Sequence, residues 1–172
     1  MSLNFSKEFL DAINRFFEGR RRLVILGIGN ELNGDDAVGL YTVKLIINTP
    51  LPEWVNVFYC EKAPEHFLGK IAKIAPNRVI VIDAADMNAP PGAIAILPRE
   101  LIWDGFSFST HTLSLKLLEE FLAHETDIND FKLLFIGIQP KQMFFDTSLS
   151  PECKNSAEEL AELIIKKIKE DN

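Results

Sequence analysis

Short, continuous apolar segments recur along the chain, and most of them are followed by a stretch with helical spacing. Four such segments have the length of a strand: 23–28 (LVILGI), 55–60 (VNVFYC), 79–82 (VIVI) and 132–138 (KLLFIGI). Strands that are apolar throughout are typical of a parallel sheet covered on both faces. Their alternation with helices predicts a three-layer α/β/α sandwich with a central, twisted, mostly parallel sheet of about five strands.

The remaining elements follow from periodicity and turn residues. Apolar side chains recur every three or four residues over 5–17, which predicts a helix that ends at Gly19. Segment 93–97 is expected to be a short antiparallel strand, because only the tight turn NAPPG precedes it. Further helices are predicted at 64–74, 112–124 and 156–168. We therefore expect an N-terminal accessory helix in residues 1–22 and a single α/β domain in residues 23–172.

Composition limits the possible partners. A chain of 172 residues with 47% hydrophobic residues suits one domain. Its formal net charge of -7 opposes binding to a phosphate backbone, so nucleic acid is not expected as a partner. The apolar runs are far shorter than the roughly 20 residues that span a bilayer, so we expect a cytoplasmic protein without membrane insertion. Cys60 and Cys153 form no CxxC motif and indicate neither a disulfide framework nor a zinc knuckle.

The stretch GIGNELNGDDAVG, residues 27–39, lies where the first strand passes into a helix. Its glycines do not make a dinucleotide fingerprint, because Leu32 stands where the third glycine belongs, and no GK[ST] motif is present. Nucleotide binding is therefore disfavoured. Asp35 or Asp36 at the start of a helix can cap free N–H groups, and the same position also suits a ligand or a catalytic group.

Three polar residues are expected at one rim of the sheet. Asp36 follows the first strand and Asp83 ends the third, and ligands of such sheets bind outside the carboxyl ends of the strands. His111, in SFSTHT, precedes another helix and can return to the same rim. Two carboxylates and an imidazole suit a divalent transition metal, although Asp36 also fits a cap and Asp83 a turn residue.

Other polar residues have plainer interpretations. His66 and His124 fall on predicted helices and are expected at the surface or in packing. Asp86 is a loop residue or at most a carboxylate that supports Asp83. Gln139 either offers its amide to a substrate or simply ends a strand before a proline turn. The sequence contains neither a GxSxG elbow nor an HExxH motif, so a conventional serine or zinc hydrolase is poorly supported.

Taken in order, several blocks resemble the [NiFe]-hydrogenase maturation endopeptidases. They are GIGNELNGDDAVG (27–39), KAPE (62–65), VIVIDAADMNAPPGAIAIL (79–97), STHTLSL (109–115) and FIGIQP (135–140). The doubled aspartate and FIGIQP resemble in particular the subgroup that processes formate-hydrogenlyase-type (hydrogenase 3) and related membrane-bound hydrogenases. The resemblance implies a phosphorylase/hydrolase-like sandwich and runs from about Leu23 to the end of the last helix. The roughly twenty residues before Leu23 depart from the short start of the family.

The resemblance also implies a function. It places the metal-contacting trio of the family on Asp36, Asp83 and His111, with Asp36 where many members have Glu. The family makes one cut near the C-terminus of the hydrogenase large-subunit precursor, after nickel has been inserted. We therefore expect nickel on the substrate and no permanent metal in the enzyme. Either an ion-activated water or an aspartate acting as general base is compatible with the trio.

Two other classes of protein are alternative interpretations of this sequence. A non-catalytic, metal-sensing chaperone of a metalloprotein precursor would bind with the same trio and cut nothing. A nucleotide-binding module is the third interpretation and lacks a phosphate-binding lysine near the loop. The expected partner is a large-subunit precursor, and the expected state is a monomer or weak oligomer.

Overall fold

The computed structural model describes residues 5–98, 100, 116–117, 120–122 and 130–170. Its elements are α1 (Lys7–Phe17), β1 (Leu23–Gly27), the 3-10 turn η1 (Gly34–Ala37), α2 (Val38–Ile47), β2 (Val55–Tyr59), the 3-10 turn η2 (Pro64–Phe67), α3 (Leu68–Ile74), β3 (Arg78–Ala84), β4 (Ile94–Ile96), β5 (Lys132–Ile138) and α6 (Pro151–Lys169). The helix predicted at 112–124 lies largely outside the described residues. Among the described residues, no helix has the length and apolar character needed to cross a bilayer.

The sheet has five strands in the order β2-β1-β3-β5-β4. The first four run parallel, and β4 pairs with β5 in the antiparallel direction, with Ile94 opposite Ile138. Both features confirm the predicted mostly parallel sheet with an antiparallel short strand. The chain leaves β1 toward β2 and then returns to the other side of β1 as β3, so the strand order reverses between β1 and β3. Ligands of open α/β sheets bind at such a reversal.

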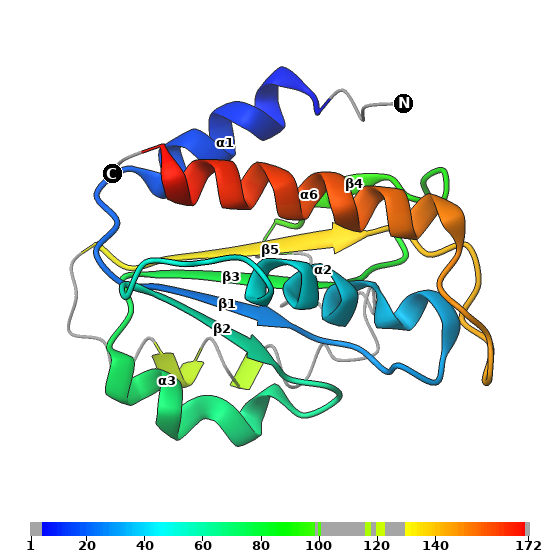
Figure 1. Cartoon of the computed structure of the whole chain (residues 1–172), viewed down its shortest axis with the longest axis horizontal. Coiled ribbons are helices and arrows are strands. Elements are labelled where there is room, and N and C mark those ends of the chain that lie inside the picture. Colours follow the sequence, from blue (N-terminus) through cyan, green and yellow to red (C-terminus); the bar gives the residue numbers. More distant parts are fainter. Residues whose placement is uncertain (1–4, 99, 101–115, 118–119, 123–129, 171–172) are drawn as a thin grey trace.

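Helices cover both faces of this sheet, as Figure 1 shows, with α1, α2 and α6 on one side and α3 on the other. Alternate strand residues supply the two cores: Leu23 and Ile25 pack with the first group of helices, and Val24 and Leu26 pack with α3. Because both faces are buried, the strand is apolar at every position. The three-layer architecture is confirmed.

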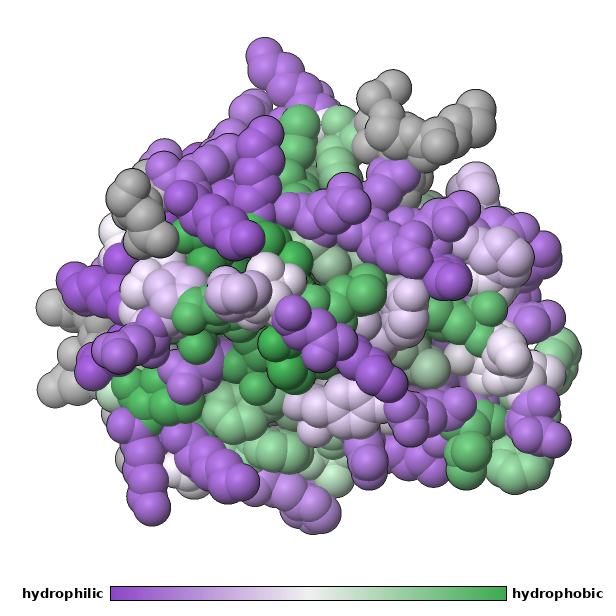
Figure 2. All heavy atoms as spheres, in the orientation of Figure 1, coloured by the Kyte–Doolittle hydropathy of each residue, from purple (hydrophilic) through white to green (hydrophobic). Residues whose placement is uncertain are grey.

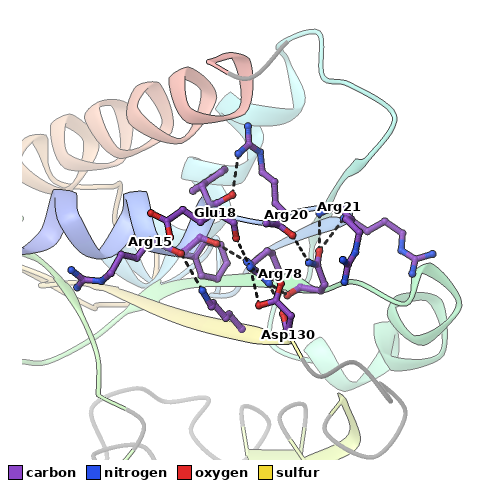
Figure 3. Close-up of polar contacts among 12 residues, drawn as sticks. Arg15, Glu18, Arg20, Arg21, Arg78 and Asp130 are labelled. Carbon is purple, nitrogen blue, oxygen red and sulfur yellow. Dashed lines mark hydrogen bonds and ion pairs between the residues drawn. The ribbon is translucent and has the colours of Figure 1, made fainter.

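A buried arginine fastens α1 to the amino end of the sheet. Arg78 begins β3 and is 1% exposed, and its Nε donates to the carbonyl of Phe16 at 2.6 Å. Its other nitrogens donate to the carbonyls of Glu18 and Asp130 and pair with the Asp130 carboxylate at 3.1 Å (Figure 3). A buried guanidinium is tolerated when its donors are satisfied in this way. The end of α1 is therefore fixed to the sheet, at the edge opposite the candidate site.

Candidate active site

The glycine-rich segment after β1 folds back tightly upon the 3-10 turn η1. Ile28 donates its N–H to the carbonyl of Ile82 at 3.0 Å, and Asn30 donates to the carbonyl of Asp36 at 3.2 Å. Gly29 has φ of 149°, and a Cβ there would lie 1.9 Å from the carbonyl oxygen of Asp36. No side chain fits that position. The glycine thus serves a close backbone approach.

A second glycine brings the start of α2 against the carboxyl end of β3. A Cβ on Gly39 would lie 2.3 Å from the carbonyl oxygen of Ile82, the residue before Asp83. Asp36 precedes Gly39 by three residues and is 4% exposed, and Asp83 is 5% exposed. The structure therefore brings Asp36 and Asp83 to the same edge of the sheet, at the reversal between β1 and β3.

The third predicted ligand, His111, lies outside the described residues. Within the part of the chain that is described, no group of three or more His, Cys, Asp or Glu side chains is arranged to hold a metal ion. The metal-contacting role of Asp36, Asp83 and His111 therefore stays a prediction. What the fold supplies is two nearly buried carboxylates at one edge, a donor set that binds divalent transition metals together with imidazole.

Asp35 and Asp36 are adjacent but have different surroundings. The Asp35 carboxylate is fully buried and accepts four hydrogen bonds. The donors are the N–H of Ser150 at 2.6 Å, the hydroxyl of Ser150 at 2.9 Å, and the N–H groups of Lys141 at 2.8 Å and Gln142 at 3.0 Å. This carboxylate holds the two ends of the loop 141–150 together and fastens them to η1.

The expectation that a carboxylate caps the helix here is wrong for Asp35. The cap positions of η1 and α2 are Asn33 and Ala37, and neither makes a side-chain capping bond. The oxygens of Asp35 are instead taken up by the distant loop. Burial alone would raise the pKa of Asp35, but the bonds from Ser150, Lys141 and Gln142 outweigh it and hold the pKa below its ordinary value. Asp35 is thus an ionised structural group near neutral pH.

Gln139 also has a structural role. Its Oε1 accepts from the N–H groups of Met87 at 2.7 Å and Ala89 at 3.2 Å, and its Nε2 donates to Asp86 at 3.2 Å. The amide is therefore used within the protein, and the interpretation that it is offered to a substrate is wrong. Asp86 correspondingly accepts from Gln139 and belongs to the loop after β3. Together these contacts fix the loop that follows Asp83 and β3.

A pocket of about 380 Å³ lies between the glycine turn and the segment after β2. It is lined by Gly29, Asn30, Glu31, Leu32, Glu61 and Lys62. The hydroxyl of Tyr59 donates to the carboxylate of Glu31, and burial together with this carboxylate raises the pKa of Tyr59. No local sequence pattern links Glu31 to Lys62, and the fold alone brings the GNEL and EKAP segments to one pocket.

The two cysteines are not activated nucleophiles. Cys60 and Cys153 are buried free thiols. Burial raises the pKa of Cys60 to about 12 and that of Cys153 to about 11, so both stay protonated near neutral pH. His66 is exposed on η2, as expected for a surface residue. His124 lies outside the described residues.

Comparison with known proteins identifies relatives over most of the chain. The family model of the hydrogenase maturation proteases (HycI) matches residues 45–167. A Methanocaldococcus jannaschii protein whose name, hydrogenase maturation protease, is provisional is 37% identical over 157 residues, which cover 87% of this chain and 90% of the relative. The hydrogenase 3 maturation protease of Escherichia coli K12 is 32% identical over 78% of this chain and 83% of its own length.

Solved structures agree with the sequence relatives. The crystal structure of the [NiFe] hydrogenase maturation protease HycI from Thermococcus kodakarensis has a TM-score of 0.82 at 31% identity, with 92% of this chain and 99% of that one covered. The likeness thus extends over the three-layer fold as a whole rather than over one motif. The chain therefore belongs to the hydrogenase maturation protease family and is an endopeptidase, a hydrolase of peptide bonds.

Proposed function

We propose that this endopeptidase removes a C-terminal peptide from a [NiFe]-hydrogenase large-subunit precursor and uses the nickel on that precursor as its recognition element. The names of the Escherichia coli and Thermococcus kodakarensis relatives support a hydrogenase as the target. The observation that carries the proposal is the placement of Asp36 and Asp83, two nearly buried carboxylates from different strand ends, at one edge.

Recognition follows from differential affinity. Asp36 and Asp83, with His111 as the third ligand, add anionic and imidazole donors to a nickel ion that the thiolates of the precursor already hold. A precursor without nickel lacks this anchor and binds more weakly, which gives specificity for the finished cofactor. The nickel belongs to the substrate, and the enzyme holds no permanent metal in this proposal.

Docking through the metal places the scissile peptide beside the two aspartates. Two routes to the attack are compatible with these residues. In one, the substrate nickel polarises a water, and in the other Asp36 or Asp83 removes a proton from it, which is aspartyl-type chemistry. Both routes deliver one hydroxyl to the carbonyl carbon and one proton to the leaving amine.

The two alternative protein classes are less well supported than a protease. A non-catalytic chaperone and a nucleotide-binding module are both set aside by membership in a protease family. A net charge of -7 supports a protein partner over a nucleic acid. A cytoplasmic location and a monomeric or weakly associated state stay predictions of this proposal.

Variants of Asp36, Asp83 and His111 test the proposal. Purified wild type, Asp36→Asn, Asp83→Asn and His111→Ala are incubated with a nickel-loaded precursor, and loss of the C-terminal peptide is followed by mass spectrometry. We expect cleavage by wild type and at least a roughly 100-fold lower rate in each variant, with unchanged circular dichroism and unfolding midpoint. Wild-type rates in the folded Asp36 or His111 variant would remove the proposed mechanism.

A further inference from the structure

Three large apolar side chains stand out from the surface of the described residues. Leu32 is 58% exposed, Phe144 68% and Phe145 76%, whereas Ile47 and Leu117, the next most exposed, are 47%. Leu32 belongs to the glycine turn, and the two phenylalanines belong to the loop between β5 and α6. The N–H of Asp146 donates to the carbonyl of Leu32 at 2.8 Å, which holds the two segments together. We call Leu32, Phe144 and Phe145 the apolar rim.

The exposure of the phenylalanines is imposed by an anchored loop. The Asp35 carboxylate binds the loop at Lys141, Gln142 and Ser150. Thr147 Oγ1 donates to the carbonyl of Phe144 at 2.6 Å and closes the tip. Burying a phenylalanine side chain is favourable, so a loop fixed with two of them in solvent forgoes a considerable stabilisation. A patch of this kind is typical of a surface that another molecule covers.

The rim borders the candidate active site. Leu32 precedes Asp36 by four residues, and Gln142 is bonded to Asp35, the neighbour of Asp36. Hydrophobic side chains are visible in Figure 2 at the right-hand end of the molecule, where the turn before α2 and the loop before α6 lie in Figure 1. A protein held at this rim therefore has direct access to the carboxyl edge of β1 and β3.

The size of the rim favours a transient partner over a second copy of the chain. One leucine and two phenylalanines expose on the order of 400 Å², given roughly 150–250 Å² for a fully exposed aromatic side chain. A stable interface buries about 800 Å² on each partner. The rim alone is thus too small for a stable dimer, whereas it suits the apolar centre of an enzyme–substrate contact that the metal completes.

We propose that the apolar rim of Leu32, Phe144 and Phe145 is a docking site for an apolar surface of the large-subunit precursor beside its C-terminal peptide. This inference rests on the proposed function, because the occupant is the same precursor. The rim contributes affinity that does not depend on nickel, and the two aspartates contribute the part that does. Together they hold a folded substrate at two points.

The test separates binding from cutting. Phe144→Ser combined with Phe145→Ser, and Leu32→Gln as a second variant on the other segment, are compared with Ile47→Gln, an exposed control on α2. With nickel-loaded precursor, we expect KM to rise about 10- to 100-fold in the double variant and less in Leu32→Gln, with kcat within about twofold of wild type. Ile47→Gln should leave both constants unchanged.

Three results would overturn the inference, and they are distinguishable. Wild-type KM in a folded double variant means that the rim does not dock the precursor, while the proposed function stands. Failure of wild type to bind or cut the precursor removes the proposed function and the docking site together. Sedimentation at several protein concentrations tests whether a second copy of the chain covers the rim. If wild type forms a dimer that the double variant does not form, and KM is the same in both, the rim is a dimer interface. That result also contradicts the proposal.

Discussion

Asp35 and Ser150, which are 115 residues apart in the sequence, are joined by two hydrogen bonds to one carboxylate. The backbone N–H of Ser150 donates to Oδ1 at 2.6 Å and its hydroxyl to Oδ2 at 2.9 Å. Ser150 is also the N-cap of α6. One buried aspartate thus fixes the start of the longest described helix, the loop before it and the turn that carries Asp36.

Replacing Asp35 is therefore expected to destabilise the protein. Asp35→Asn leaves N–H donors of Lys141, Gln142 and Ser150 facing an amide that can accept at only one atom. We expect a loss of about 2–4 kcal/mol in the free energy of unfolding, measured by urea denaturation. Glu162→Gln, at an exposed position of α6, is the matched control and should change stability by less than about 0.5 kcal/mol. An Asp35→Asn variant as stable as this control would contradict the structural role.

The same carboxylate predicts a dependence on pH. The pKa of Asp35 is lower in the folded protein than its ordinary value of 3.8, so the ionised form stabilises the fold. This contribution is fully present above the unfolded pKa and is lost as the pH falls from about 5 through the folded value. Unfolding free energies of wild type and Asp35→Asn, measured between about pH 7 and pH 3, should converge toward the acid end. A constant difference over this range would exclude the linkage.

Two glycines provide a matched pair for the geometry of the site. Gly39→Ala places a Cβ 2.3 Å from the carbonyl oxygen of Ile82, so α2 must move away from β3. We expect a loss of about 1–3 kcal/mol together with slower processing. In α3, a Cβ on Gly69 would meet no heavy atom within 4 Å, and Gly69→Ala should stabilise by about 0.5–1 kcal/mol. Thermal unfolding of both variants checks this, and equal melting temperatures would contradict the close approach.

Arg78 is expected to be the most sensitive residue at the opposite edge. Arg78→Met leaves the carbonyls of Phe16, Glu18 and Asp130 without their donor, at a cost of about 3 kcal/mol in unfolding free energy. Asp130→Asn is the control. The Asp130 side chain is 43% exposed, so loss of its charge should cost less than about 1 kcal/mol. Similar losses in the two variants would show that the ion pair, rather than the carbonyl contacts, carries the stability.

The sheet is predictable because its signal is local. Strand β5 begins and ends where the apolar run predicts, at Lys132 and Ile138. Periodicity places the start of the last helix at 156, whereas α6 begins at Pro151. The missed signal is local too: Ser150 accepts a hydrogen bond from the N–H of Cys153, and Pro151 occupies the first turn.

The roles of the polar residues depend on contacts that the sequence does not show. Asp35 and Asp36 are identical in type and adjacent, and only the return of the loop 141–150 distinguishes them. Gln139 looks available to a substrate because its partners Met87 and Ala89 are about fifty residues earlier in the chain. The edge that holds Asp36 and Asp83 is predictable from parallel topology, while the structural use of their neighbours is not.

Recognition through nickel is tested most directly by cleavage of one large-subunit precursor prepared in two forms, with and without the metal. Both forms are incubated with the wild-type enzyme, and intact mass spectrometry follows the release of the C-terminal peptide. We predict release from the nickel-loaded form and little or none from the nickel-free form, since only the former presents a metal to Asp36 and Asp83. Equal rates of release from the two forms would contradict recognition through nickel.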